Sequence, residues 1–195
     1  MAPGSLIQSE EGVLRPVDIV VMDYTIKEFQ EESVREVQDC FKYRDADTVT
    51  WINVNGVHDV SVLKTLNDHF QIHPLATEDI HNTGHRPKSE EFEEHLFLIL
   101  KMLYMDPNQP DEIVSEQVSI VLGKNYVISF QEHPGDVFDP VRERIRDGKG
   151  RIRTMGPDYL AYALMDAIVD NYYSVLEQLG ERVETLETAM IQDVQ

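Results

Sequence analysis

The C-terminal part of the chain carries an apolar repeat that is typical of a long helix. From Pro157 onward, large apolar side chains recur three and four residues apart without a miss: Tyr162, Met165, Val169, Tyr172, Leu176, Leu179, Val183, Leu186 and Met190. This spacing places them on one stripe of a helix, as in a coiled coil. A helix spanning residues 157–195 is roughly 58 Å long. We therefore expect it to pack against something beyond its own domain.

The same segment is strongly acidic. It holds one basic residue, Arg182, against eight acids: Asp158, Asp166, Asp170, Glu177, Glu181, Glu184, Glu187 and Asp193. Surface helices ordinarily interleave lysines with acids to gain stabilising pairs four residues apart, and this helix does not. The chain stops at Gln195 in mid-pattern and without capping residues, which indicates a truncation.

The whole chain shares this charge bias, with 36 acidic and 17 basic residues and a net charge of −19. Such a field repels nucleic acids and anionic membranes and concentrates cations. A purely solubilising role for the acidity stays open. Cys40 is the only cysteine, so an intrachain disulfide is excluded and a reducing compartment is expected. No signal peptide is recognisable, and the most apolar stretch, 96–105, is far below the roughly 20 residues of a membrane span. We expect a soluble chain.

The first 156 residues alternate strand and helix patterns. Residues 17–24 and 48–54 are rich in Val and Ile, which favours buried strands. Helical spacing follows over 59–70, where Asp59 can cap the start, and over 74–82, which Pro74 opens. Further strands are predicted at 95–105, 115–122 and 126–132, with a hairpin loop at 106–112 and a helix within 136–150. The pattern predicts an α/β sandwich around a mixed sheet.

The pair Glu78 and Asp79 is the most suggestive cluster of acids. Adjacent helical residues point about 100° apart, so the two carboxylates can line a shared site or two neighbouring sites. Carboxylate oxygens suit hard cations such as Mg²⁺. Asp166 and Asp170, four apart on the long helix, are the natural second wall of such a site. The alternative is a solvated helix N-terminus, where the dipole favours acids.

Other constellations support specific chemistry less well. Among seven histidines, two pairs lie four apart (His69/His73 and His81/His85), but Pro74, Gly84 and Pro87 interrupt the helices that would align them. We expect most histidines to be surface or capping residues rather than zinc ligands. The basic residues of 142–153 are expected to pair with neighbouring acids. No G-x-S-x-G, P-loop or GxGxxG is present, so an enzyme would depend on Glu78 or Asp79 as a general base, with no identifiable nucleophile.

Five stretches taken together resemble the cytoplasmic domain of CorA-type magnesium and cobalt channels. They are HPLATEDIHN, RPKSEEFEEHLFLILKM, SEQVSIVLGKNYVISFQE, GDVFDPVRERIR and DYLAYALMDAIVDNYY, and the resemblance runs from about Trp51 to the C-terminus. It implies an α/β/α cytoplasmic domain over residues 1–156, followed by an acidic amphipathic helix of the cytoplasmic funnel over 157–195. It also implies a homopentamer at the cytoplasmic face of the cell membrane, in which regulatory Mg²⁺, or Co²⁺, sits between neighbouring copies and holds the closed state.

The resemblance assigns residues as well. Asp79 matches the interfacial Mg²⁺ ligand, and Glu78 matches the acid of a neighbouring second site. Asp166 is the expected partner of Glu78, and Asp170 is a weaker candidate. The rest of the stalk helix, both transmembrane helices and the Gly-Met-Asn signature of the family lie outside this sequence.

The sequence therefore predicts a cytosolic Mg²⁺-sensing domain of a CorA-like channel, without catalytic activity. The cytosolic domain of a related zinc transporter, a soluble metal-dependent hydrolase and a plain oligomerisation module built on the 162–190 stripe are the alternatives. The ion that is transported (Mg²⁺, Co²⁺ or Zn²⁺), the oligomeric state and the role of the histidines stay open.

Overall fold

The computed structural model describes residues 16–106, 109 and 112–192. The start of the chain, most of the predicted loop at 106–112 and Asp193 lie outside the described residues.

A seven-stranded sheet forms the centre of the fold, with the order β2-β1-β3-β7-β6-β5-β4. The parallel pair is β3 (Val49–Asn55) with β7 (Tyr126–Gln131), and the other neighbours pair antiparallel, so the sheet is mixed as predicted. The remaining strands are β1 (Asp18–Tyr24), β2 (Phe29–Val34), β4 (Lys88–Glu91), β5 (Leu96–Met105) and β6 (Ile113–Leu122).

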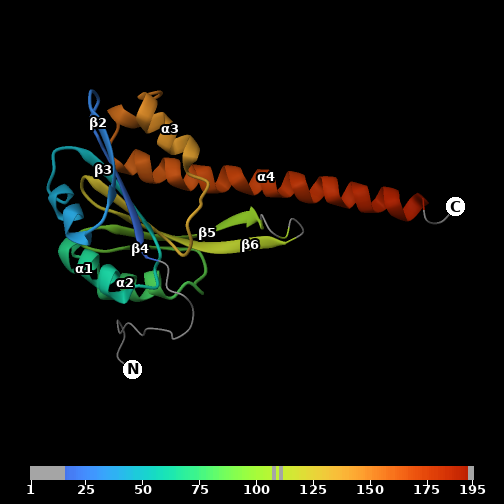
Figure 1. Cartoon of the computed structure of the whole chain (residues 1–195), viewed down its shortest axis with the longest axis horizontal. Helices are drawn as coiled ribbons and strands as arrows, with labels where there is room; N and C mark the ends of the chain where they lie inside the picture. The colour runs from blue at the N-terminus through green and yellow to red at the C-terminus, as the bar shows by residue number, and fades with distance from the viewer. Residues whose placement is uncertain (1–15, 107–108, 110–111, 193–195) are drawn as a thin grey trace.

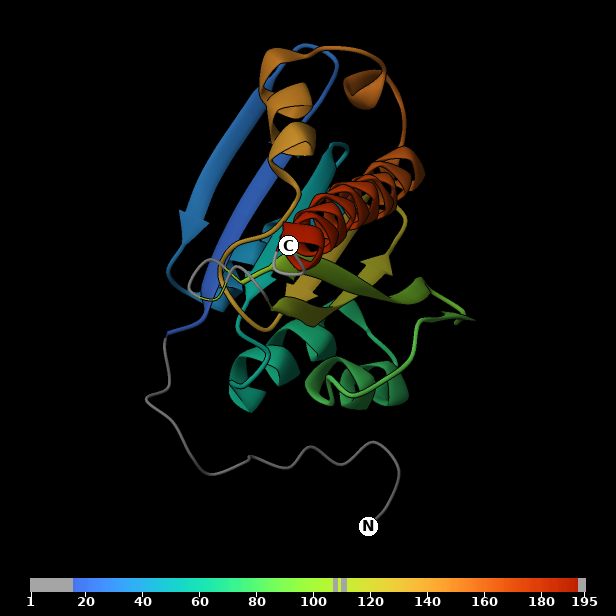
Figure 2. The same cartoon turned by 90° about the vertical axis from the view of Figure 1, so that its right-hand side faces the viewer.

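Helices cover both faces of the sheet. One face carries α1 (Val60–Phe70) and α2 (Pro74–His81), and the other carries α3 (Asp139–Asp147) and α4 (Pro157–Gln192) (Figures 1 and 2). Short 3₁₀ helices span Val37–Tyr43 and Ile152–Thr154. Each face has its own apolar core, one containing Leu63 and Ile80 and the other containing Trp51 and Leu164. The predicted α/β/α sandwich with a long C-terminal helix is confirmed.

Local capping explains where α1 and α2 begin. Asp59 accepts hydrogen bonds from the backbone of Ser61 (2.9 Å) and Val62 (3.2 Å), as its position predicts. The His73 Nδ1 accepts one from the backbone of Leu75 (3.2 Å), and Pro74 occupies the first turn, where its missing N–H costs nothing. These caps fix the start of α2, on which Glu78 and Asp79 lie.

Helix α4 confirms the predicted helix, and it packs on the sheet through a face other than the apolar stripe. The α4 residues buried in the core on this face of the sheet are Leu160, Ala161, Ala163, Leu164, Ala167 and Ile168, and Val175 is also buried. Of the predicted stripe, Met165 and Tyr172 are partly buried in this core. Most of the remaining stripe is exposed, and beyond Val175 the helix projects past the sheet (Figure 1). Within the described residues no helix is long and apolar enough to cross a membrane.

Candidate metal site around Asp79

Glu78 and Asp79 lie in the last turn of α2, and the first turn of this helix contains no acid. The interpretation of the pair as a solvated helix N-terminus is therefore wrong. Near the C-terminal end the helix dipole disfavours negative charge, so the dipole does not stabilise these carboxylates. Their stabilisation has to come from cationic neighbours.

Asp79 is a largely buried carboxylate held by two basic side chains. The Nζ of Lys88 lies 2.6 Å from Oδ2 of Asp79. The Nε2 of His85 lies 3.0 Å from Oδ1, which is an ion-pair distance when the ring is protonated, although the His85 contact does not have the geometry of a hydrogen bond. Only 13% of the Asp79 side chain is exposed. Within one chain, both carboxylate oxygens thus face positive or protonatable groups.

Lys88 bridges two acids. Its ammonium also donates a hydrogen bond to Oε1 of Glu90 at 2.9 Å. Burial lowers the pKa of Lys88, but the hydrogen bonds to Asp79 and Glu90 outweigh this effect, so the pKa lies above its ordinary value. Lys88 is therefore a cation throughout the physiological pH range.

Gln117 on β6 fixes the backbone around Asp79. Its Nε2 donates to the carbonyl oxygen of Asp79 at 2.9 Å, and its Oε1 accepts from the backbone N–H of His85 at 3.2 Å. Lys101 on β5 donates to the carbonyl oxygen of Thr83 at 2.8 Å. The end of α2 and the loop that follows are thus attached to two central strands, which holds the Asp79 carboxylate in place.

The other three predicted ligands lie apart from Asp79 or make no joint site with it. Glu78 is half-buried and makes contacts within the chain. Asp166 accepts a hydrogen bond from the Tyr162 hydroxyl at 3.4 Å, and Asp170 is exposed one turn later on α4. Because α2 and α4 cover opposite faces of the sheet (Figure 2), one chain does not bring these acids together.

Among the residues that the structure describes, no group of three or more His, Cys, Asp or Glu side chains is arranged to hold a metal ion. The assignment of Glu78, Asp79, Asp166 and Asp170 as metal ligands stays a prediction.

Several described histidines have structural contacts. The His69 ring stacks on Phe41 at 3.8 Å, and the Nδ1 of His81 lies 3.0 Å from the carbonyl oxygen of Val57. His73 caps α2, and His95 is buried. The cap formed by His73 agrees with the expectation that most histidines are surface or capping residues, whereas the burial of His95 does not.

The predicted pairing with acids is found for three of the basic residues in 142–153, whereas Arg144 and Arg153 donate to backbone carbonyl oxygens. Arg142 pairs with Asp136 and Asp139, Arg146 with Glu31, and Lys149 with Asp147. No comparable pattern in the sequence marks Lys88, His85 and Gln117 as neighbours of Asp79, because they lie outside helix α2.

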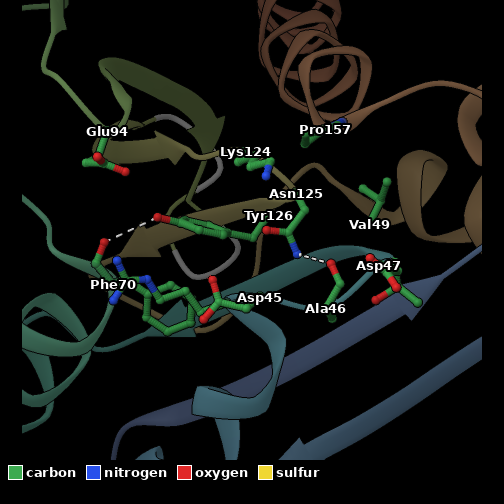
Figure 3. Close-up of a pocket in the computed structure, with 12 residues that line it drawn as sticks. Asp45, Ala46, Asp47, Val49, Phe70, Glu94, Lys124, Asn125, Tyr126 and Pro157 are labelled. Carbon is green, nitrogen blue, oxygen red and sulfur yellow. Dashed lines mark hydrogen bonds between the residues drawn. The ribbon is translucent and has the colours of Figure 1, made fainter.

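A cavity of about 450 Å³ lies near the start of α4, where Pro157 is part of its lining (Figure 3). Its polar groups are used by the fold: Tyr126 donates to the carbonyl oxygen of Phe70 (3.3 Å), and Asn125 donates to those of Tyr43 and Ala46 (3.0 and 2.9 Å). Neither Glu78 nor Asp79 lines it. This cavity is therefore not one in which Glu78 or Asp79 would act as the general base of a hydrolase.

Comparison with known proteins points to one family. Residues 46–195 match the family described as CorA-like Mg²⁺ transporter protein. The chain is 45% identical over 193 residues to the cobalt/magnesium transport protein CorA of Thermotoga maritima, covering 98% of this chain and 54% of that protein. It thus spans about half the length of this relative.

Solved structures share the fold. The complete CorA magnesium transporter of Methanocaldococcus jannaschii superimposes with a TM-score of 0.65 at 20% identity, over 89% of this chain and 51% of that one. The ZntB cytoplasmic domain of Vibrio parahaemolyticus gives a TM-score of 0.57 at 13% identity, over 82% and 63%.

Proposed function

The chain belongs to the family of CorA-like Mg²⁺ transporter proteins, and we propose that it is the cytosolic Mg²⁺-sensing part of such a transporter. In this proposal the chain lies at the cytoplasmic face of the cell membrane and assembles into a homopentamer through its own copies. Mg²⁺, or Co²⁺, bound between copies at Asp79, Glu78, Asp166 and Asp170 favours the closed state. The chain itself catalyses no reaction.

The observation that carries this proposal is the apolar face of α4 that projects beyond the sheet. Leu176, Val183, Leu186 and Met190 are each more than half exposed, at 61%, 54%, 63% and 70%. Contiguous exposed apolar side chains with this spacing mark an association surface. Because acids flank the stripe, copies that associate through it bring like charges together.

Charge gives the assembly its dependence on divalent ions. With a net charge of −19 per chain, neighbouring copies repel when no cation lies between them. A bridging ion removes part of this repulsion, so it binds the associated state better than the separated state and shifts the equilibrium toward it. Mg²⁺ suits this role because it accepts one or two carboxylate oxygens and retains several waters.

The donor set around Asp79 fits a hard cation. Its carboxylate is fixed by the Gln117 contact to its backbone, and Lys88 already places one cationic group on it. Carboxylate oxygens are the ligands that Mg²⁺ prefers. Since one chain supplies only part of the coordination, the remaining ligands would come from water and from a neighbouring copy.

Thermal unfolding with and without Mg²⁺ tests the proposal. We expect millimolar Mg²⁺ to stabilise the chain by about 2.7 kcal/mol at a hundredfold excess over Kd, which is roughly 5–10 °C for a domain of this size. Asp79→Asn should remove most of this shift. Asp68→Asn, which changes an exposed acid on α1, is the matched control and should keep it. An equal shift in Asp79→Asn would exclude Asp79 as the ligand.

The likeness to the ZntB cytoplasmic domain supports a second candidate, the cytosolic domain of a zinc transporter. In that case Zn²⁺ would raise the melting temperature and Mg²⁺ would not. The same titration with Zn²⁺ separates the two functions.

A further inference from the structure

We propose that Lys88 is a built-in competing cation that makes the Asp79 site respond to divalent ions and ignore monovalent ones. The inference rests on the proposed role of Asp79 as an ion ligand. It gives Lys88 a role in ion selectivity that its place on an edge strand does not suggest.

The geometry places the Lys88 ammonium where a bound ion would lie. Its Nζ is 2.6 Å from Oδ2 of Asp79, and the carboxylate is only 13% exposed. With the His85 ring 3.0 Å from Oδ1, each carboxylate oxygen already has a basic side chain beside it. An ion that coordinates Oδ2 therefore competes with the Lys88 ammonium for the charge of this carboxylate.

Displacement discriminates by charge. A monovalent ion such as K⁺ brings the same charge as the ammonium, so exchanging one for the other gains little Coulomb energy. Lys88 is also tethered nine residues from Asp79, and tethering gives it an effective concentration in the millimolar range or above. A divalent ion brings twice the charge, and its attraction to the same carboxylate is correspondingly larger. Lys88 should thus exclude monovalent ions and weaken, without preventing, the binding of Mg²⁺.

Glu90 provides a second partner for the displaced ammonium. It lies 2.9 Å from the Lys88 Nζ, and its side chain is 39% exposed. When an ion takes Asp79, Lys88 can keep the Glu90 contact, so displacement breaks one of two ion pairs. The ammonium also remains close enough to return when the ion leaves.

Calorimetric titration of the 195-residue chain with Mg²⁺ tests the proposal, at one protein concentration and in choline-based buffer. Lys88→Met should bind Mg²⁺ about tenfold more tightly than the wild type, the change expected when a competitor worth a single partly buried ion pair is removed. Lys64→Met removes an exposed lysine on α1 and makes the same change in net charge. Its Kd should stay within about twofold of the wild type.

A second arm exchanges choline for K⁺ at constant ionic strength. K⁺ should weaken Mg²⁺ binding several-fold in Lys88→Met and leave the wild type within about twofold. Circular dichroism confirms that each variant is folded before titration.

The outcomes distinguish the role of Asp79 as an ion ligand from the role of Lys88 as a competing cation. If Asp79→Asn binds Mg²⁺ as the wild type does, the ligand assignment is wrong and the role of Lys88 falls with it. If Asp79→Asn loses binding but Lys88→Met leaves both Kd and K⁺ sensitivity unchanged, the sensing function stands and the competing-cation role is overturned. If the wild type gives no heat, Lys88→Met should still bind, and its failure to do so also overturns the proposal.

Discussion

Replacing Asp136 with alanine should cost the chain about 3–4 kcal/mol of its free energy of unfolding. The Asp136 carboxylate forms a two-pronged pair with the Arg142 guanidinium, with N–O distances of 2.6 and 2.5 Å, and its side chain is only 4% exposed. Removing one partner of a buried pair leaves the other charge uncompensated, which typically costs about 3–5 kcal/mol. The change also leaves the backbone N–H of Phe138, now bonded to Asp136 at 2.9 Å, without its acceptor.

Arg142 itself offers the matched control. It also contacts Asp139 at 3.0 Å, but the Asp139 side chain is 79% exposed. Exposed pairs contribute about 0–1 kcal/mol, so Asp139→Ala should be nearly neutral. The two substitutions remove the same group from the same arginine and differ in burial.

Urea unfolding followed by circular dichroism measures the difference, in EDTA so that bound ions do not add stability. With an m value of about 3 kcal/mol per molar, Asp136→Ala should lower the midpoint by about 1 M. The double variant Asp136→Ala/Arg142→Met should lose less than the sum of the single losses, because no charge is left alone. Equal midpoints for Asp136→Ala and Asp139→Ala would refute the argument from burial.

Three further predictions concern other parts of the chain. Burial, followed by the charge of nearby His73, lowers the pKa of His95 below its ordinary value of 6.5. The unfolded state then binds more protons than the native state, so the free energy of unfolding should fall as the pH drops below about 6.5. His95→Gln should flatten this pH dependence in thermal melts, and an unchanged slope would exclude His95 as its source. Burial raises the pKa of the Cys40 thiol to about 12. A thiol reagent at neutral pH should therefore label Cys40 only in denaturant. Rapid labelling of the native chain would contradict the burial of this side chain. Leu186→Ser should weaken self-association by roughly 10- to 100-fold in sedimentation, because one buried leucine side chain is lost from the interface. Thr188→Ser is the control and should leave self-association unchanged. Equal association of the two variants would exclude the stripe as the interface.

The central strands could be predicted from the sequence, and the edge strands could not. Strands β3, β5 and β7 are runs of apolar residues because both faces of the sheet are covered there. The edge strands β2 (FQEESV) and β4 (KSEE) consist mainly of polar residues that face water, so neither shows an apolar pattern. Their place in the sheet is set by pairing with β1 and β5, which a local pattern does not reveal.

At the candidate site too, a local pattern reveals the helix but not its contacts with distant elements. The acid pair and its helix could be found from the spacing of HPLATEDIHN, and Pro74 marked the start of that helix. The partners of Asp79 could not, because Lys88 comes from an edge strand and Gln117 from a central one. Whether Asp79 coordinates an ion depends on these partners and on a neighbouring copy, so its role as a ligand stays a prediction.

Helix α4 shows why the apolar repeat revealed one of its two apolar faces and missed the one that packs on the sheet. Its first half carries two apolar faces, one with Leu160, Leu164 and Ile168 and the other with Tyr162 and Val169, and both repeat at helical spacing. Alanines decide between them: Ala161, Ala163 and Ala167 flank the first face and are buried against the core, where a small side chain allows close approach. Beyond Val175 the first face ends, and only the second face continues to Met190. The first half of the helix thus packs on its own sheet, and in the proposed sensor the exposed second half would contact neighbouring copies.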